Sequence, residues 1–251
     1  MANVSDNYVR LLYKRYELFA AWLPNTKVQL GDVGVIEGKY FRRVTTLGSL
    51  GVGFKVRVGS MPLAFNDNLT AGLQVHVNAE GGVAAGAAPP LAEGCVSIQF
   101  AGEGAFLFHA FNCYTDEVED KVAVGNALVA LGERWDADWA LVDTLVRAGS
   151  ATILLSNSRA ARLDLRAKAA ADLSNLANPE LGLGVASQSG DVTQFLAEKG
   201  LTPLFRLSKL GRSWIDWLRG KSKTIYFGGP SSAKPAPPEE EILEHAAPDL
   251  S

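Results

Sequence analysis

The residue types that suit catalysis or metal binding are few in this chain and do not cluster along it. The chain has three histidines and two cysteines. His109 and Cys113 are four residues apart, but on the strand predicted here their side chains lie too far apart to share one ion. No second pair completes a ligand set. We therefore predict a hydrogen-bonded histidine and a buried thiol, and no metal site.

Motifs for nucleophilic catalysis and phosphate binding are incomplete. The chain has no Gly-x-Ser-x-Gly turn, and neither cysteine has an evident histidine partner. Gly220-Lys221-Ser222 is similar to the end of a phosphate-binding loop, but Ile215 stands where that motif requires glycine. Residues 48–53 are glycine-rich but lack the spacing of a dinucleotide-binding turn. We predict a protein that is not an enzyme and that binds no cofactor.

Charge is distributed unevenly along the chain. The net charge is −3, but all 24 basic residues and all but five of the 27 acidic residues precede Glu239. The body is therefore mildly basic and the end acidic, which fits either a tail that screens a surface or a simple solubility device. Basic and aromatic residues do not alternate along a predicted strand, so we expect no nucleic-acid partner.

Length and hydropathy favour a cytoplasmic protein. The N-terminus has no basic stretch followed by an apolar one, so no secretory signal is predicted. No run approaches the ~18 apolar residues of a spanning helix. Two cysteines in 251 residues do not make a disulfide framework.

The hydrophobic pattern predicts an α+β fold, with one strand-rich domain over residues 1–227 and a disordered, acidic, proline-rich tail over 228–251. Residues 105–111 are apolar on both faces and are expected to form a covered central strand. Other strands are predicted at 28–36, 40–46, 54–58, 73–78, 96–100, 150–156, 162–166, 181–186, 203–207 and 224–227. Helices are predicted at 6–22, 116–131, 136–147 and 214–219, and a mobile loop at 79–94.

Two predicted strands have one apolar and one polar face. Their apolar faces hold Val75, Val77, Val96, Ile98 and Phe100. A strand that enters a bilayer needs such a face over about 9–11 residues. Trp214 and Trp217, beside basic residues, are further candidates for membrane contact. The alternative is that the strands belong to a half-exposed sheet and the tryptophans anchor packing.

The order of segments resembles that of the bacterial gasdermins over roughly residues 5–210. The similar segments are 22–24, 28–34, 47–50, 96–100, 108–122, 145–153, 162–167 and 200–205. The resemblance implies a twisted, mostly antiparallel sheet with peripheral helices. It also implies a precursor autoinhibited by its C-terminal segment, activated by a partner protease. The family's acylated cysteine near the N-terminus has no counterpart before Cys95.

On this hypothesis, the activated protein forms a homo-oligomeric pore in the lipids of the inner membrane and kills the cell in defence against phage. Arg219, Lys221 and Lys223 form the candidate cleavage region, because this stretch is basic and expected to be exposed. A second hypothesis is a non-enzymatic binding or scaffold protein that acts through a sheet edge or the acidic tail. A third, an enzyme of unrecognised type, requires a deep pocket around His76 or His109.

Overall fold

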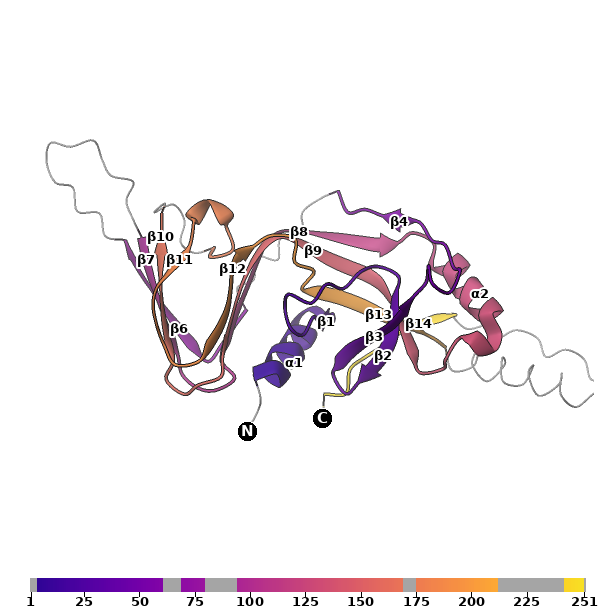
Figure 1. Ribbon diagram of the computed structural model, residues 1–251, viewed down its shortest axis with the longest axis horizontal. Helices are drawn as coiled ribbons and strands as arrows, with labels where there is room; N and C mark the ends of the chain where they lie inside the picture. Colours follow the sequence, from indigo (N-terminus) through magenta and orange to yellow (C-terminus); the bar gives the residue numbers. More distant parts are fainter. Residues whose placement is uncertain (1–3, 61–68, 80–93, 169–174, 212–241, 251) are drawn as a thin grey trace, which may run out of the picture.

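The computed structural model describes residues 4–60, 69–79, 94–168, 175–211 and 242–250. Within them the chain forms two α-helices and two open sheets in which the strand pairs are antiparallel, which confirms the predicted α+β class (Figure 1). The helices are α1 (Val4–Tyr16), α2 (Lys121–Leu131) and the short 3-10 helices η1 (Gly132–Arg134) and η2 (Pro179–Leu181). The strands are β1 (Phe19–Ala20), β2 (Asp32–Glu37), β3 (Tyr40–Thr46), β4 (Val56–Arg57), β5 (Leu69–Ala71), β6 (Leu73–Ala79), β7 (Gly94–Phe100), β8 (Phe106–Val118), β9 (Trp139–Ser156), β10 (Arg162–Ala167), β11 (Gly184–Ser189), β12 (Val192–Glu198), β13 (Leu204–Leu210) and β14 (Leu243–His245).

The long strands β8 and β9 form a ribbon that connects the two ends of the molecule (Figure 1). At one end, the second half of β9 pairs with β12. At the other end, its first half pairs with β2 and β13. The larger sheet is therefore built around one ribbon, and the two ends differ in what covers it.

At the first end, a separate four-stranded sheet packs on the ribbon. We call it sheet B; its strand order is β11-β10-β7-β6. Its inward residues, among them Ile98 and Leu163, share one apolar cluster with Leu107 of β8 and Leu154 of β9. Because this face of the ribbon is buried by sheet B, the two sheets form a sandwich.

Helix α1 covers the opposite face of the same ribbon. Tyr8 and Leu12 recur at helical spacing and are fully buried against Phe106 and Phe108. The Tyr8 and Phe106 ring centroids are 5.4 Å apart in an edge-to-face arrangement. The predicted central strand at 105–111, covered on both faces, is confirmed.

The predicted helix at 6–22 is too long. The helix ends at Tyr16, and Glu17 takes a φ of 56°, outside the helical region. Phe19 and Ala20 then pair with Phe205 and Leu204 of β13 as a short strand.

The predicted helix at 136–147 is wrong, because residues from Trp139 onward belong to β9. The strand is buried on both faces, so apolar residues occur on both and the strand alternation is lost. The three- and four-residue spacing of Trp139, Val142 and Val146 imitates a helix face. The predicted helix at 116–131 is partly right: it begins only at Lys121, after Asp120, whose side chain caps it by accepting from the Ala123 N–H.

At one point in the ribbon, the side chains of both strands switch from one face of the sheet to the other. Ala110 and Cys113 point into the same cluster although they are three residues apart, and so do Ala148 and Ala151. Between them Asn112 has a φ of 49°. A Cβ at Gly149 would lie 3.0 Å from the Cβ of Asn112, so this close approach favours glycine.

Residues 242–250 pack against the body, which differs from the disorder predicted for this part of residues 228–251. β14 pairs with β13, where Ser208 faces His245 and Leu210 faces Leu243. Pro248 is buried. The predictions that fall on residues 214–219, 224–227 and 228–241 lie outside the described part of the chain.

Candidate functional site

Sheet B consists of the strand pairs β6–β7 and β10–β11; β6, β7 and β10 are amphipathic, whereas β11 is exposed along its length. Its apolar face is fully covered at the centre, where Val96 faces Leu165 and Ile98 faces Leu163 across the β7–β10 pairing. Side chains alternate along each strand, so the residues between these positions point outward. The sequence separates the two hairpins by about 60 residues, and the fold joins them into one amphipathic sheet.

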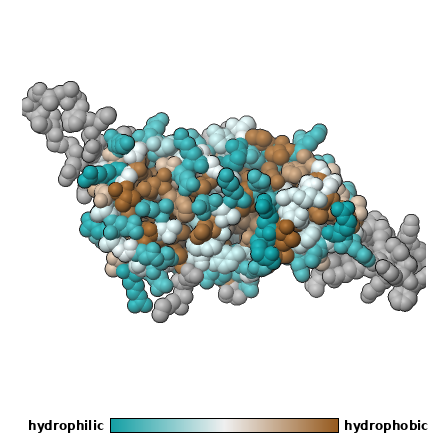
Figure 2. Space-filling view, in the orientation of Figure 1, coloured by the Kyte–Doolittle hydropathy of each residue, from teal (hydrophilic) through white to brown (hydrophobic). Residues whose placement is uncertain are grey.

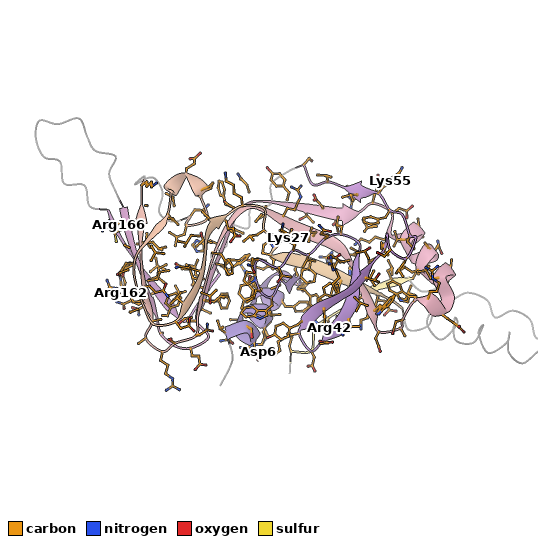
Figure 3. The ribbon with its side chains drawn as sticks, viewed as in Figure 1. Asp6, Lys27, Arg42, Lys55, Arg162 and Arg166 are labelled. Atoms are coloured by element: carbon orange, nitrogen blue, oxygen red, sulfur yellow. The ribbon has the colours of Figure 1, made fainter. Side chains whose placement is uncertain are left out.

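The outward face of sheet B is polar. One row across all four strands consists of His76, Ser97, Asp164 and Ser187. Asp164 accepts hydrogen bonds from Ser187 Oγ at 2.6 Å and from Arg162 Nε at 3.0 Å. Hydrogen bonds from Ser187 and Ser97 lower the pKa of Asp164 to about 2, so this carboxylate is ionised at neutral pH. Figure 3 shows Arg162 and Arg166 on the outer side of the sandwich.

The residues proposed to contact a membrane fall into three groups: buried, partly exposed, and outside the described part of the chain. Val96, Ile98 and Phe100 are buried between the two sheets, whereas Val75, on the edge strand β6, is 39% exposed. Val77 lies on β6 opposite Val96, but its side chain is not among those that the structure describes. Trp214, Trp217 and the candidate cleavage residues Arg219, Lys221 and Lys223 also lie outside the described residues.

The second hairpin belongs to the same candidate site, although it was not predicted as part of it. Leu163 and Leu165 alternate with Arg162, Asp164 and Arg166, and both leucines are fully buried. The strict alternation of residues 162–166 was the available signal. No sequence pattern indicated that this strand pairs with β7.

The surface outside the sandwich core carries isolated apolar side chains. Val58 and Val122 are 61% and 66% exposed, on the β4 side and on α2. Figure 2 shows hydrophobic and hydrophilic residues interspersed over one face of the molecule. The central residues of the apolar face of sheet B, among them Ile98 and Leu163, are inside the protein in this conformation.

Residues 242–250, which we call the C-terminal clasp, bind the end opposite sheet B. Beyond the β13–β14 pairs, Gly211 N–H donates to Ile242 O at 2.9 Å and Ala246 N–H to Leu207 O at 2.9 Å. A Cβ at Gly125 of α2 would lie 2.8 Å from Ile242 Cγ2, and its three nearest atoms all belong to Ile242 and Leu243. Because Gly125 has no side chain, Ile242 and Leu243 of the clasp have room to pack against α2.

The clasp also reaches the turn between β2 and β3. The N–H of Asp249 donates to Gly38 O at 3.1 Å. The segment thus contacts α2, β13 and this turn within nine residues. In sequence, 30 residues, 212–241, separate this segment from the last described residue after β13.

A buried ion pair fixes α2 beside the clasp. Asp143 of β9 is fully buried, and its carboxylate lies 2.8 Å from Lys121 Nζ. Ser208 Oγ donates to Asp143 at 2.7 Å, and Thr144 Oγ1 donates at 2.9 Å. All the charge of Asp143 is compensated, which is typical of a structural pair.

The histidine and cysteine of β8 show no arrangement for catalysis. Cys113 is buried, as predicted, and burial raises the pKa of its thiol to about 12, which disfavours the reactive thiolate. His109 is buried too, but among the described residues its Nδ1 has no hydrogen-bond partner, so that part of the prediction is wrong. Burial lowers the pKa of His109 to about 4. His76 lies on the polar outer face of sheet B, opposite Ser97.

Three or more potential metal ligands do not come together anywhere in the described residues. Neither α-helix in this part of the chain has the length and apolar character to cross a membrane. No protein-family model and no curated protein matches the chain.

Proposed function

We propose that this protein is an autoinhibited pore-forming protein whose sheet B enters a membrane after the C-terminal clasp is removed. The observation that carries the proposal is the two-faced character of sheet B. Its apolar face suits lipid and its polar face suits water, as strands of a membrane pore require. In the precursor, β8, β9 and β12 cover the centre of the apolar face, while Val75 of β6 and Val185 of β11 at its two edges stay partly exposed.

The strand order of sheet B supports assembly from several copies. Its edges are β6 and β11, and three successive antiparallel pairings make these two edges run in opposite directions. β6 of one copy is therefore able to pair antiparallel with β11 of the next, so that repeated copies form one continuous sheet. A closed sheet satisfies every backbone group in lipid.

The proposal requires the hairpins to lengthen. The strands of sheet B are six or seven residues long. A membrane strand needs about 9–11 residues. The connection between β6 and β7, residues 80–93, is long enough to supply them.

The clasp acts on assembly in this proposal, because β14 and sheet B lie at opposite ends of the molecule (Figure 1). It occupies the edge of β13 and covers apolar side chains of α2 and its neighbours. Cleavage near Arg219, Lys221 or Lys223 by a partner protease would free both surfaces for a second copy. The precursor would reside in the cytoplasm and the pore in the inner membrane, where it kills the cell in antiphage defence.

Dye release from anionic liposomes tests the proposal. The protein carries an engineered protease site between residues 223 and 242, so that the same preparation is assayed before and after cleavage. We expect release only after cleavage. Cleaved protein that has lost the clasp and releases no dye would contradict pore formation.

A matched pair of variants separates clasp release from cleavage. Gly125→Leu places a side chain where Ile242 packs, while leucine favours the helix over glycine by about 1 kcal/mol. It is expected to release dye without protease. Asn126→Leu adds the same side chain at an exposed position of α2 and is expected to stay inactive.

A second candidate is a binding or scaffold protein that uses a sheet edge. The exposed, polar side chains of β11 favour it. This candidate predicts a stable complex with a partner, no association with liposomes and no change on loss of the clasp.

A further inference from the structure

One edge of β13 is shared by two segments from opposite ends of the chain, while β9 pairs with the other edge. β1 pairs with the start of β13, and the clasp bonds to the stretch from Leu207 to Gly211. The clasp therefore occupies a short site with a fixed end, because a longer strand would meet β1. After Ala246 the clasp leaves this edge, and Pro248, which has no N–H to pair, is buried.

The side chains of the clasp reach two apolar clusters, one on each face of the larger sheet. Ile242 and Leu243 pack against the cluster that holds Leu128 of α2. Ala246 packs against the cluster that holds Phe205 of β13. The two residues between Leu243 and Ala246 are exposed. The site therefore recognises two adjacent apolar side chains, leaves the next two positions free, and accepts a small residue after them.

The elements that form this site are held by contacts with the body. β13 pairs with β9 over residues 204–208. α2 is fixed by its buried side chains Val124 and Leu128 and by the ion pair of Lys121 with Asp143. A site that is formed before binding loses little freedom when it binds, and this favours binding of a separate peptide.

We infer that this site binds an extended peptide that is not covalently attached to it, and that its occupant is the clasp of another copy of the chain. The peptide adds a strand to the edge of β13, in the antiparallel direction of β14. This binding needs no membrane. Its consequence rests on the proposed function: clasps released by cleavage would rebind cleaved copies and keep them from assembling until the released clasps are diluted.

The docked state of the clasp limits the affinity of the separate peptide. A covalent connection supplies an effective concentration of about 1 mM when it is short and flexible, and less when it is longer. The clasp is docked in the intact chain. We therefore expect the separate peptide to bind with a dissociation constant below about 1 mM.

Fluorescence anisotropy of a labelled peptide of residues 242–250 tests the inference. The peptide is titrated with the full chain carrying Leu243→Asp, which places a carboxylate in the cluster beside α2 and weakens the chain's own clasp. We expect saturable binding with a dissociation constant below about 1 mM. The unaltered chain, whose own clasp occupies the site, is the control and is expected to bind the peptide about tenfold more weakly or less.

Paired variants locate the binding. In the peptide, Leu243→Ala removes apolar contact and is expected to weaken binding about tenfold. Glu244→Ala, at an exposed position of the same peptide, is expected to stay within about twofold. In the chain, Gly125→Leu fills the space of Ile242 and is expected to abolish binding, whereas Asn126→Leu, exposed on α2, is expected to leave it unchanged.

Two results overturn the inference. One is a titration that does not approach saturation up to about 1 mM. The other is binding that is insensitive to Leu243→Ala in the peptide and to Gly125→Leu in the chain, because the peptide would then bind elsewhere. If circular dichroism shows that the Leu243→Asp chain is unfolded, the chain cut at the engineered site between residues 223 and 242 takes its place in the same titration.

Dye release separates this inference from the proposed function. Peptide added to the cleaved chain is expected to suppress dye release at the concentrations at which it binds. Release that persists with the site saturated overturns the consequence for assembly and leaves pore formation intact. A cleaved chain that binds the peptide but releases no dye in its absence contradicts pore formation alone.

Discussion

The two ends of the β8–β9 ribbon are stabilised by different interactions. At the sandwich end, sheet B contacts the ribbon through aliphatic side chains such as Ile98, Leu107 and Leu163. The other end has apolar clusters too, but there the fully buried Asp143 also pairs with the partly exposed Lys121, and Asp116 accepts from Arg147 Nη2 at 3.0 Å.

On the proposed function, this difference favours movement of the sandwich end. An aliphatic face that leaves the protein core for lipid exchanges one apolar environment for another, since lipid tails are as apolar as leucine. Separating a buried ion pair leaves a desolvated charge without a partner. The sandwich is therefore suited to open, and the ion-paired end is suited to remain a fixed base.

Breaking the ion pair is expected to have the largest effect. Lys121→Met leaves Asp143 buried and uncompensated, and we expect a loss of about 3–5 kcal/mol in the free energy of unfolding. Urea denaturation followed by tryptophan fluorescence measures it. The double variant Lys121→Met/Asp143→Leu removes both charges and should recover most of the loss; failure to recover would mean that Lys121 contributes mainly by packing.

Removing apolar contact at the sandwich end is expected to cost less on average. Leu163→Ala leaves a cavity between the sheets and should lower the free energy of unfolding by about 2–5 kcal/mol. Gln99→Ala, on the exposed face of the same sheet, is the control and should stay within about 0.5 kcal/mol. Equal effects at the two positions would show that sheet B does not pack on the ribbon as described.

His109 is a buried titratable side chain within the apolar end, and it makes that end sensitive to pH. Its pKa in the folded protein is about 4; the ordinary value is about 6.5. The contribution of His109 to the free energy of unfolding is therefore complete above pH 6.5. It decreases as the pH falls toward 4, by about 3 kcal/mol in total. His109→Leu is expected to remove this part of the pH dependence, and an unchanged profile of unfolding against pH would assign it to other groups.

The smallest effect is expected at a surface ion pair. Arg42 and Glu37 lie 2.7 Å apart and are both more than half exposed. Arg42→Gln should change the free energy of unfolding by less than about 0.5 kcal/mol. A larger loss, measured by the same urea titration, would show that charge pairs contribute without regard to burial, and the contrast between the two ends would then not follow from burial.

Local pattern predicted several half-exposed strands and the buried segments 105–111 and 150–156, but it missed the first half of β9 and the whole of β12. The alternation of residues 73–78, 96–100 and 162–166 corresponds to β6, β7 and β10. β9 was predicted in part as a helix because both its faces are buried. Its partners come from distant segments, which a single sequence does not indicate.

The candidate site was predicted in the same uneven way. The apolar face of Val96, Ile98 and Phe100 follows from alternation, whereas its union with β10 depends on tertiary pairing. The clasp was missed because β14 has only three residues and a tail rich in Pro and Glu predicts disorder. Its order comes from the space at Gly125, which lies on another element.

The switch of side chains from one face to the other at Asn112 and Gly149 determines where the two ends can be exchanged. Inside and outside alternate with a period of two along a strand, so one inserted residue inverts every side chain beyond it. Because side chains switch face at this point, which residues point inward is set separately for each end of the ribbon. A chimera joined at Asn112 and Gly149 would keep both halves in phase, whereas one whose junction gains or loses a residue in β8 would turn one half inside out.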